Sequence, residues 1–271
     1  MARVIVITSG KGGVGKTTTT SNIGMALAGL GNKVLLIDAD VGLRNLDLLL
    51  GMENRIIYTG TDVIGEKCSI EKTLVHDKRQ PNLSFFPLSS NQAKEAITKE
   101  QLQNFIDKLA PKYDFILLDS PAGIDEGFET AVQPAHEAII VVTPEVSSIR
   151  DADKVIGILE TKKMGEIQLL INRLRPKMVR VENMMSIEDI TDILGIPLVG
   201  VVPDSERVII ASNRGEPLVL EDNLSRPGKA FEETARRLNG EEIKFIDFDF
   251  IPQTNPVKRL LQNFISRSDD S

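Results

Sequence analysis

The run TSGKGGVGKT, at residues 8–17, constrains the fold of this chain more than any other feature. It follows the apolar run Val4–Ile7 and precedes a segment with helical periodicity, which indicates a strand, a glycine-rich loop and a helix. The run fits G-x-x-x-x-G-K-[ST], a loop that holds a polyphosphate with backbone N–H groups and the positive end of the following helix. The candidate nucleotide-binding residues in this loop are Gly10, Lys11, Gly12, Gly13, Val14, Gly15, Lys16, Thr17 and Thr18.

Lys16 and Thr17 carry the chemistry expected of such a loop. The ammonium of Lys16 would neutralise charge on the outer phosphates, and the Thr17 hydroxyl would be a ligand of Mg²⁺, which prefers oxygen ligands. The alternative is a glycine-rich turn that binds nothing. The strand before the loop and the helix after it favour phosphate binding over that alternative.

A second lysine, Lys11, follows the first glycine of the loop. The run KGGVGKT, at residues 11–17, resembles the deviant Walker A motif of the ParA/MinD class of P-loop ATPases. Members of that class form homodimers around two ATP molecules, and the first lysine of each subunit reaches the phosphates held by its partner. The resemblance implies this role for Lys11, whereas without the motif it would be a solvated lysine in a loop.

Two carboxylates, Asp38 and Asp40, follow the predicted buried strand Val34–Ile37, at the sheet edge where open α/β folds bind ligands. The run DADVGLRNLD, at residues 38–47, resembles switch I of the MinD ATPases, which select the division site of bacteria or plastids. The resemblance implies that Asp40 positions the attacking water and that Asp38 lies on the magnesium side. The alternative is that both aspartates cap a helix. The candidate catalytic residues are Lys11, Lys16 and Asp40.

A third carboxylate, Asp119, ends the apolar strand that begins at Asp114. A strand that ends in aspartate fits the Walker B arrangement, in which the carboxylate contacts the magnesium shell. The following residues DSPAG, at 119–123, resemble MinD switch II, and the run PEVSSIRD, at 144–151, resembles a MinD surface that faces the partner subunit and regulators. The candidate metal-binding residues are Thr17, Asp38 and Asp119.

Two further strand ends resemble the purine-contacting positions of the class. Asn172 and Arg173 end one predicted strand, and the amide of Asn172 has both a donor and an acceptor for an adenine edge. Pro203 and Asp204 end the last predicted strand and resemble the second purine-contacting loop. We therefore expect these four residues to complete the nucleotide site.

Strands alternate with helices along most of the chain, which predicts an α/β fold with a doubly wound, mostly parallel sheet and helices on both faces. The 271 residues divide into an ATPase domain at 1–240, a tether at 241–254 and a tail at 255–271. A net charge of −7 argues against a DNA-binding surface, and no nucleic acid is expected. The single cysteine, Cys68, excludes an iron–sulfur reductase of the same class. No run reaches the ~20 apolar residues of a membrane-spanning helix. We expect no signal peptide, because the first apolar run ends after Ile7 and enters the phosphate loop.

The tail fits an amphipathic helix that opens with Asn255 and Pro256. Basic residues on its polar side suit an interfacial membrane anchor, as in the MinD family, although a terminal helix docked on its own domain is the alternative. The acidic end Ser268–Ser271 would weaken attraction to anionic lipid. The candidate membrane residues are Val257, Leu260, Leu261, Phe264 and Ile265.

The resemblance spans nearly the whole chain and implies a MinD-like ATPase that positions the division site of a cell or plastid. It implies that the protein dimerises with MgATP, binds the inner face of the cell membrane or the inner envelope of a plastid from the cytoplasm or stroma, and leaves the membrane on hydrolysis. The family also implies a MinC-like division inhibitor and a MinE-like activator as partners. Three alternatives share the loop: a flagellar-number ATPase, a ParA-like DNA-segregation ATPase, and a nucleotide-locked membrane scaffold with negligible turnover.

Overall fold

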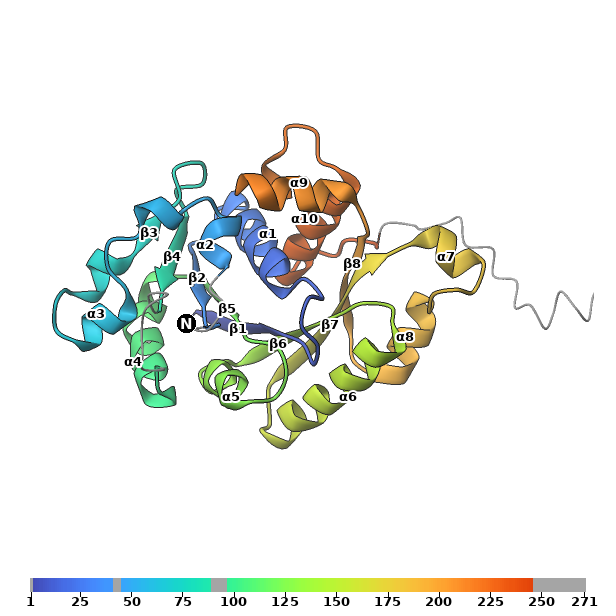
Figure 1. The fold of residues 1–271 in the computed structure, drawn as a ribbon, viewed down its shortest axis with the longest axis horizontal. Helices are drawn as coiled ribbons and strands as arrows, with labels where there is room; N and C mark the ends of the chain where they lie inside the picture. The colour runs from blue at the N-terminus through green and yellow to red at the C-terminus, as the bar shows by residue number, and fades with distance from the viewer. Residues whose placement is uncertain (1, 41–44, 89–96, 246–271) are drawn as a thin grey trace, which may run out of the picture.

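The computed structural model describes residues 2–40, 45–88 and 97–245, and in them an eight-stranded sheet lies between two layers of helices (Figure 1). The strands are β1 (Arg3–Thr8), β2 (Val34–Asp38), β3 (Val75–His76), β4 (Leu83–Pro87), β5 (Phe115–Asp119), β6 (Glu137–Val142), β7 (Glu166–Leu174) and β8 (Leu198–Pro203). The α-helices are α1 (Lys16–Gly29), α2 (Leu46–Leu49), α3 (Gly60–Ile64), α4 (Lys99–Leu109), α5 (Glu126–Val132), α6 (Val146–Thr161), α7 (Pro176–Arg180), α8 (Ile187–Leu194), α9 (Glu206–Arg214) and α10 (Arg226–Leu238).

The strand order is β3-β4-β2-β5-β1-β6-β7-β8. Neighbouring strands run parallel except β3 and β4, which are antiparallel. The order reverses around β1, so the loop after β1 lies at the switch point where open sheets bind ligands. The predicted doubly wound, mostly parallel fold is confirmed.

Alternating residues of each strand point to opposite faces of the sheet and contribute to two separate hydrophobic cores. In β1, Val4 and Val6 belong to one core, with apolar residues of α4, α5, α6 and α8, whereas Ile5 and Ile7 belong to the other, with apolar residues of α1 and α10. Both sets are buried, as expected of parallel strands that helices cover on each face. The sheet is therefore a rigid base for the loops at its carboxyl edge.

Helix α1 is buried more completely than its sequence suggests. A stripe at Ile23, Ala26, Leu27 and Leu30 predicts one buried face, but Ser21 and Asn22 on other faces are buried too. The reason is that Ser21 and Asn22 face α9 and the segment that follows it, where the backbone N–H of Val219 donates to Oδ1 of Asn22. None of the described helices is long and apolar enough to cross a membrane.

Candidate functional site

Two glycines of the loop after β1 lie very close to residues of β7 and α6. Gly15 has φ 100°, and a Cβ there would lie 2.3 Å from Nδ2 of Asn172. A Cβ on Gly10 would lie 2.4 Å from the backbone carbonyl of Asp151 in α6. Glycine is therefore required at both positions, by conformation and space at Gly15 and by space at Gly10. The sequence motif indicates that glycine is needed at these positions, but it does not indicate that Asn172 and Asp151 are the residues in close contact with them.

Lys16 opens α1 and its ammonium is nearly buried. Its Nζ donates to Oγ of Ser9 over 3.0 Å, and that hydroxyl donates to the carbonyl of Lys11 over 2.7 Å. Burial lowers the pKa of Lys16, while the carboxylates of Asp119 and Asp40 act in the opposite direction. A desolvated cation at the end of a phosphate loop is suited to pair with a phosphate oxygen. Ser9, which sequence reasoning did not single out, orients it.

Asp38 and Asp119 face each other at the carboxyl ends of neighbouring strands. They are directly paired in the register of β2 and β5, and each residue is 2% exposed. Burial raises the pKa of both carboxyl groups, and the charge of Asp38 raises that of Asp119 further. A carboxyl group whose charged form is disfavoured by burial and by a neighbouring carboxylate is stabilised in that form by a nearby cation.

The surroundings of Asp119 fit a hydrated magnesium ion. Asp119 accepts a hydrogen bond from the hydroxyl of Thr20 over 3.2 Å and another from Thr17. Within the described ranges, no three His, Cys, Asp or Glu residues are grouped as a metal site. Mg²⁺ at this position would therefore take few protein ligands and complete its shell with water and phosphate oxygens, which is its usual preference.

Asp38 also has a structural role that the sequence left as the alternative. Its Oδ2 accepts hydrogen bonds from the backbone N–H groups of Asn45 (3.1 Å) and Leu46 (3.0 Å) at the start of α2. Its Oδ1 accepts one from Asp40 N over 3.0 Å. Asp38 thus fixes both the backbone of Asp40 and the start of α2, so the two aspartates have different environments.

Lys11 lies outside the phosphate cradle of its own chain. Its Nζ contacts Oε2 of Glu145 at 2.9 Å and Oγ of Ser147 at 3.1 Å, both near the start of α6. The side chains of Lys11 and Glu145 are 41% and 57% exposed, so water screens this pair. Its role across a dimer interface stays a prediction.

The predicted base-contacting residues gather at the ends of β7 and β8. The amide of Asn172 donates to the carbonyl of Val14 over 2.8 Å, and its Oδ1 accepts from Arg173 N. Arg173 has φ 57°, a strained conformation for a non-glycine residue at a site edge. Asp204 pairs with Arg175 over 2.7 Å. The structure therefore brings the base-side and phosphate-side candidates to one edge of the sheet.

Comparison with known proteins agrees with this geometry. The model of the CobQ/CobB/MinD/ParA nucleotide binding domain matches residues 5–218. A putative septum site-determining protein MinD from Emiliania huxleyi is 68% identical over 271 residues, covering 100% of both chains. The chain belongs to the MinD family. The predicted resemblance is thereby confirmed, and so is a nucleotide-binding P-loop domain.

Two solved structures of the MinD family have the same fold. The MinC:MinD cell division protein complex from Aquifex aeolicus matches with a TM-score of 0.83 and 51% identity, over 90% of this chain and 98% of that chain. The septum site-determining protein MinD complexed with Mg-ADP from Pyrococcus horikoshii matches with a TM-score of 0.79 and 33% identity, over 88% and 96%. The candidate membrane residues of the tail lie outside the residues that the structure describes.

Proposed function

We propose that this protein is an ATPase that forms a homodimer with MgATP at a membrane surface and positions a division site. The observation that carries the proposal is the convergence of Lys16, Asp38, Asp40 and Asp119 on the loop after β1. The relatives named as septum site-determining proteins support the cellular role. The Aquifex aeolicus MinC:MinD complex supports a MinC-like partner, and a MinE-like activator follows by family analogy.

The groups at the site divide the work of phosphoryl transfer. Lys16 would bind phosphate oxygens, and the loop backbone would orient them for in-line attack. Thr17 and Asp119 would hold Mg²⁺, which supplies positive charge where the transferred phosphate develops negative charge. Asp40 would accept a hydrogen bond from the attacking water and set its direction.

Replacing Asp40 by alanine is expected to lower the turnover number at least ~10-fold and leave the dissociation constant for MgATP within ~3-fold, because general-base and positioning groups act mainly in the transition state. The variant should accumulate as the ATP-bound dimer. Steady-state phosphate release and equilibrium binding measure the two quantities. Wild-type turnover in the variant would favour the nucleotide-locked scaffold instead.

Lys11→Ala is expected to keep ATP binding and lose the ATP-dependent dimer. In a dimer Lys11 must leave Glu145 and Ser147, and this release is easy because an exposed ion pair is worth about 0–1 kcal/mol. Glu145→Gln, the matched control, should therefore dimerise within ~5-fold of wild type or slightly better. Sedimentation velocity with ATP reads the oligomeric state. A Lys11→Ala protein that dimerises normally would remove the trans role.

ATP hydrolysis measured alone, with anionic lipid vesicles and with DNA separates the proposed function from its rivals. Stimulation by vesicles without a DNA effect is expected for the proposed membrane ATPase. Stimulation by DNA alone would support the ParA-like segregation function, which the net charge of −7 disfavours. A flagellar-number ATPase would also respond to lipid, so binding to a purified MinC-like protein distinguishes that case.

A further inference from the structure

Arg79 forms a cluster away from the nucleotide loop, in the turn between β3 and β4. Its guanidinium donates to both carboxylate oxygens of Asp77, from Nη2 over 2.7 Å and from Nε over 3.2 Å. The side chain of Asp77 is 1% exposed. Burial alone would raise the pKa of Asp77, but the hydrogen bonds and charge of Arg79 outweigh it and leave that pKa below its ordinary value. The two hydrogen bonds to Asp77 therefore fix the orientation of the Arg79 guanidinium.

The remaining donors of Arg79 reach the carboxyl ends of two helices. Nη2 donates to the carbonyl of Leu50, which caps α2, over 2.6 Å. Nη1 donates to the carbonyl of Gly215, which caps α9, over 3.0 Å. Carbonyls at helix ends lack partners within the helix and carry partial negative charge, so one cation satisfies both ends.

The same two helix ends touch through their backbones. Gly51 and Gly215 both have positive φ, at 62° and 63°. A Cβ on Gly215 would lie 2.7 Å from Cα of Gly51, and a Cβ on Gly51 would lie 2.9 Å from the carbonyl oxygen of Gly215. Only glycine permits this approach, so Arg79 and the glycine pair form one joint between α2 and α9.

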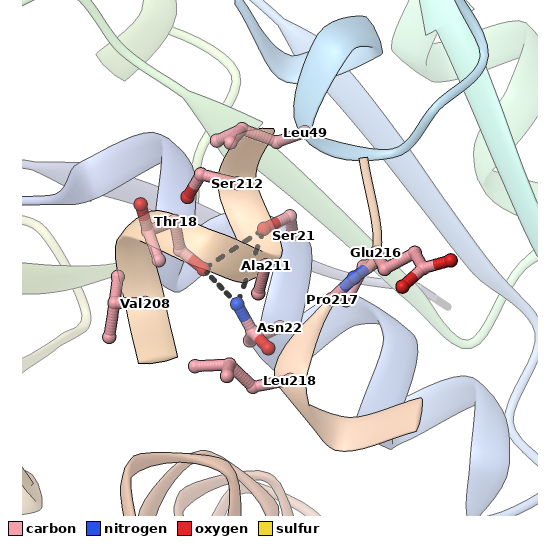
Figure 2. A pocket seen from close by; sticks show the side chains of 10 residues that line it. All are labelled: Thr18, Ser21, Asn22, Leu49, Val208, Ala211, Ser212, Glu216, Pro217 and Leu218. Carbon is pink, nitrogen blue, oxygen red and sulfur yellow. Dashed lines mark hydrogen bonds between the residues drawn. The ribbon is translucent and has the colours of Figure 1, made fainter. Parts of the chain in front are cut away.

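Each helix at this joint leads back to the candidate site. The start of α2 is held by Asp38, while α9 begins directly after the loop at Asp204. Helices α2 and α9 also line a shallow hollow with α1, the helix that starts at Lys16 (Figure 2). The hollow is lined by Thr18, Ser21, Asn22, Leu49, Val208, Ala211, Ser212, Glu216, Pro217 and Leu218. The joint thus connects the two helices, α2 and α9, that lie beside α1, the helix that follows the phosphate loop.

We propose that Arg79 is a positioning residue for ATP hydrolysis: it holds α2 against α9 and thereby fixes the segment that carries Asp38 and Asp40 relative to the loop at Asp204. This inference rests on the proposed ATPase function. Misplacing a reacting group by about 1 Å can cost ~10²-fold in rate, so a loosened joint affects turnover before it affects the phosphate contacts of Lys16.

Arg79→Lys tests the joint because lysine keeps a positive charge beside buried Asp77 but lacks the planar fork that reaches two further carbonyls. Amide hydrogen exchange of the nucleotide-free protein should be at least ~10-fold faster in both residues 46–52 and residues 206–216. The turnover number should fall ~10-fold while the dissociation constant for ATP stays within ~3-fold. A residue that acts only on overall stability would not produce this split in a protein that remains folded.

Two further variants keep the outcome decisive. Arg55→Lys is the matched control, since Arg55 donates to the carbonyl of His76 near the same segment without reaching α9, and it should leave exchange and turnover unchanged. Gly215→Ala forces the two backbones apart and should reproduce the effects of Arg79→Lys. Unchanged exchange in either helix, or wild-type turnover, in Arg79→Lys would overturn the inference. A wild-type protein without any hydrolysis would instead refute the proposed function, and the exchange result would still decide whether Arg79 couples the helices.

Discussion

Lys16→Ala is expected to weaken MgATP binding by roughly 100-fold or more, at ~1.4 kcal/mol per factor of ten. Lys16 is 8% exposed and its ammonium is held by Ser9 at the end of the phosphate loop. Removing one partner of a buried charge pair costs about 3–5 kcal/mol, because the remaining charge, here on the nucleotide, loses its compensation. Isothermal titration calorimetry with MgATP gives the dissociation constants directly.

The matched comparison for this prediction is Lys11→Ala in the same loop. The ammonium of Lys11 is bound to Glu145 and Ser147 at an exposed position, so its removal should leave binding to the single chain within ~3-fold. Thermal unfolding of both variants without nucleotide controls for loss of fold. Equal affinity of wild type and Lys16→Ala would contradict the phosphate-loop assignment.

The sequence predicts the strands, the loop and the helix that form this site well, because these elements depend on local patterns. Apolar runs before Asp38 and Asp119 predict the two central strands, and parallel pairing then places both carboxylates side by side. The glycine motif likewise predicts the loop and a helix directly after it, and α1 begins at Lys16. These features follow from periodicity and from residue types that only one backbone shape accommodates.

Contacts between distant segments are what the sequence does not show. Arg79 is one arginine among many in the sequence, and its role appears only when the ends of α2 and α9 meet beside it. The cap that Asp38 provides for α2 depends on where the start of α2 lies relative to the end of β2. The burial of Asn22 depends on the segment at Val219, whose backbone N–H donates to Oδ1 of Asn22 from 197 residues later in the chain. Composition and spacing carry no direct signal for such packing.

The described residues include the first five of the predicted tether, at 241–245. Arg237 in α10 donates to the carbonyls of Ile243 (2.8 Å) and Lys244 (2.9 Å), and its guanidinium lies 4.0 Å from the centre of the Phe245 ring. Residues 241–245 therefore lie against the domain. In a homodimer, two tethers would start from two fixed positions, which sets the distance over which both tails can act together.

A single tail is expected to bind a membrane only weakly. As a helix, residues 257–267 would be about 16 Å long at ~1.5 Å per residue, too short for a hydrocarbon core of ~30 Å, so we propose that it lies in the interface. Burying a large apolar side chain is worth ~1.5–3 kcal/mol, and ordering the helix and losing free motion offset much of this gain. The second tail of a dimer acts at an effective concentration near the millimolar range and raises avidity by ~10²–10⁴.

We therefore expect the protein to sediment with anionic vesicles in ATP and to remain largely in solution in ADP. Leu261→Glu and Phe264→Glu should each abolish sedimentation while ATP-dependent dimerisation in solution persists, because both place a charge on the predicted apolar face. Gln262→Glu adds the same charge to the polar face and should reduce binding far less. Equal sedimentation in ADP and ATP, or a Gln262→Glu defect as large as the other two, would favour a tail docked on its own domain over a membrane switch controlled by dimerisation.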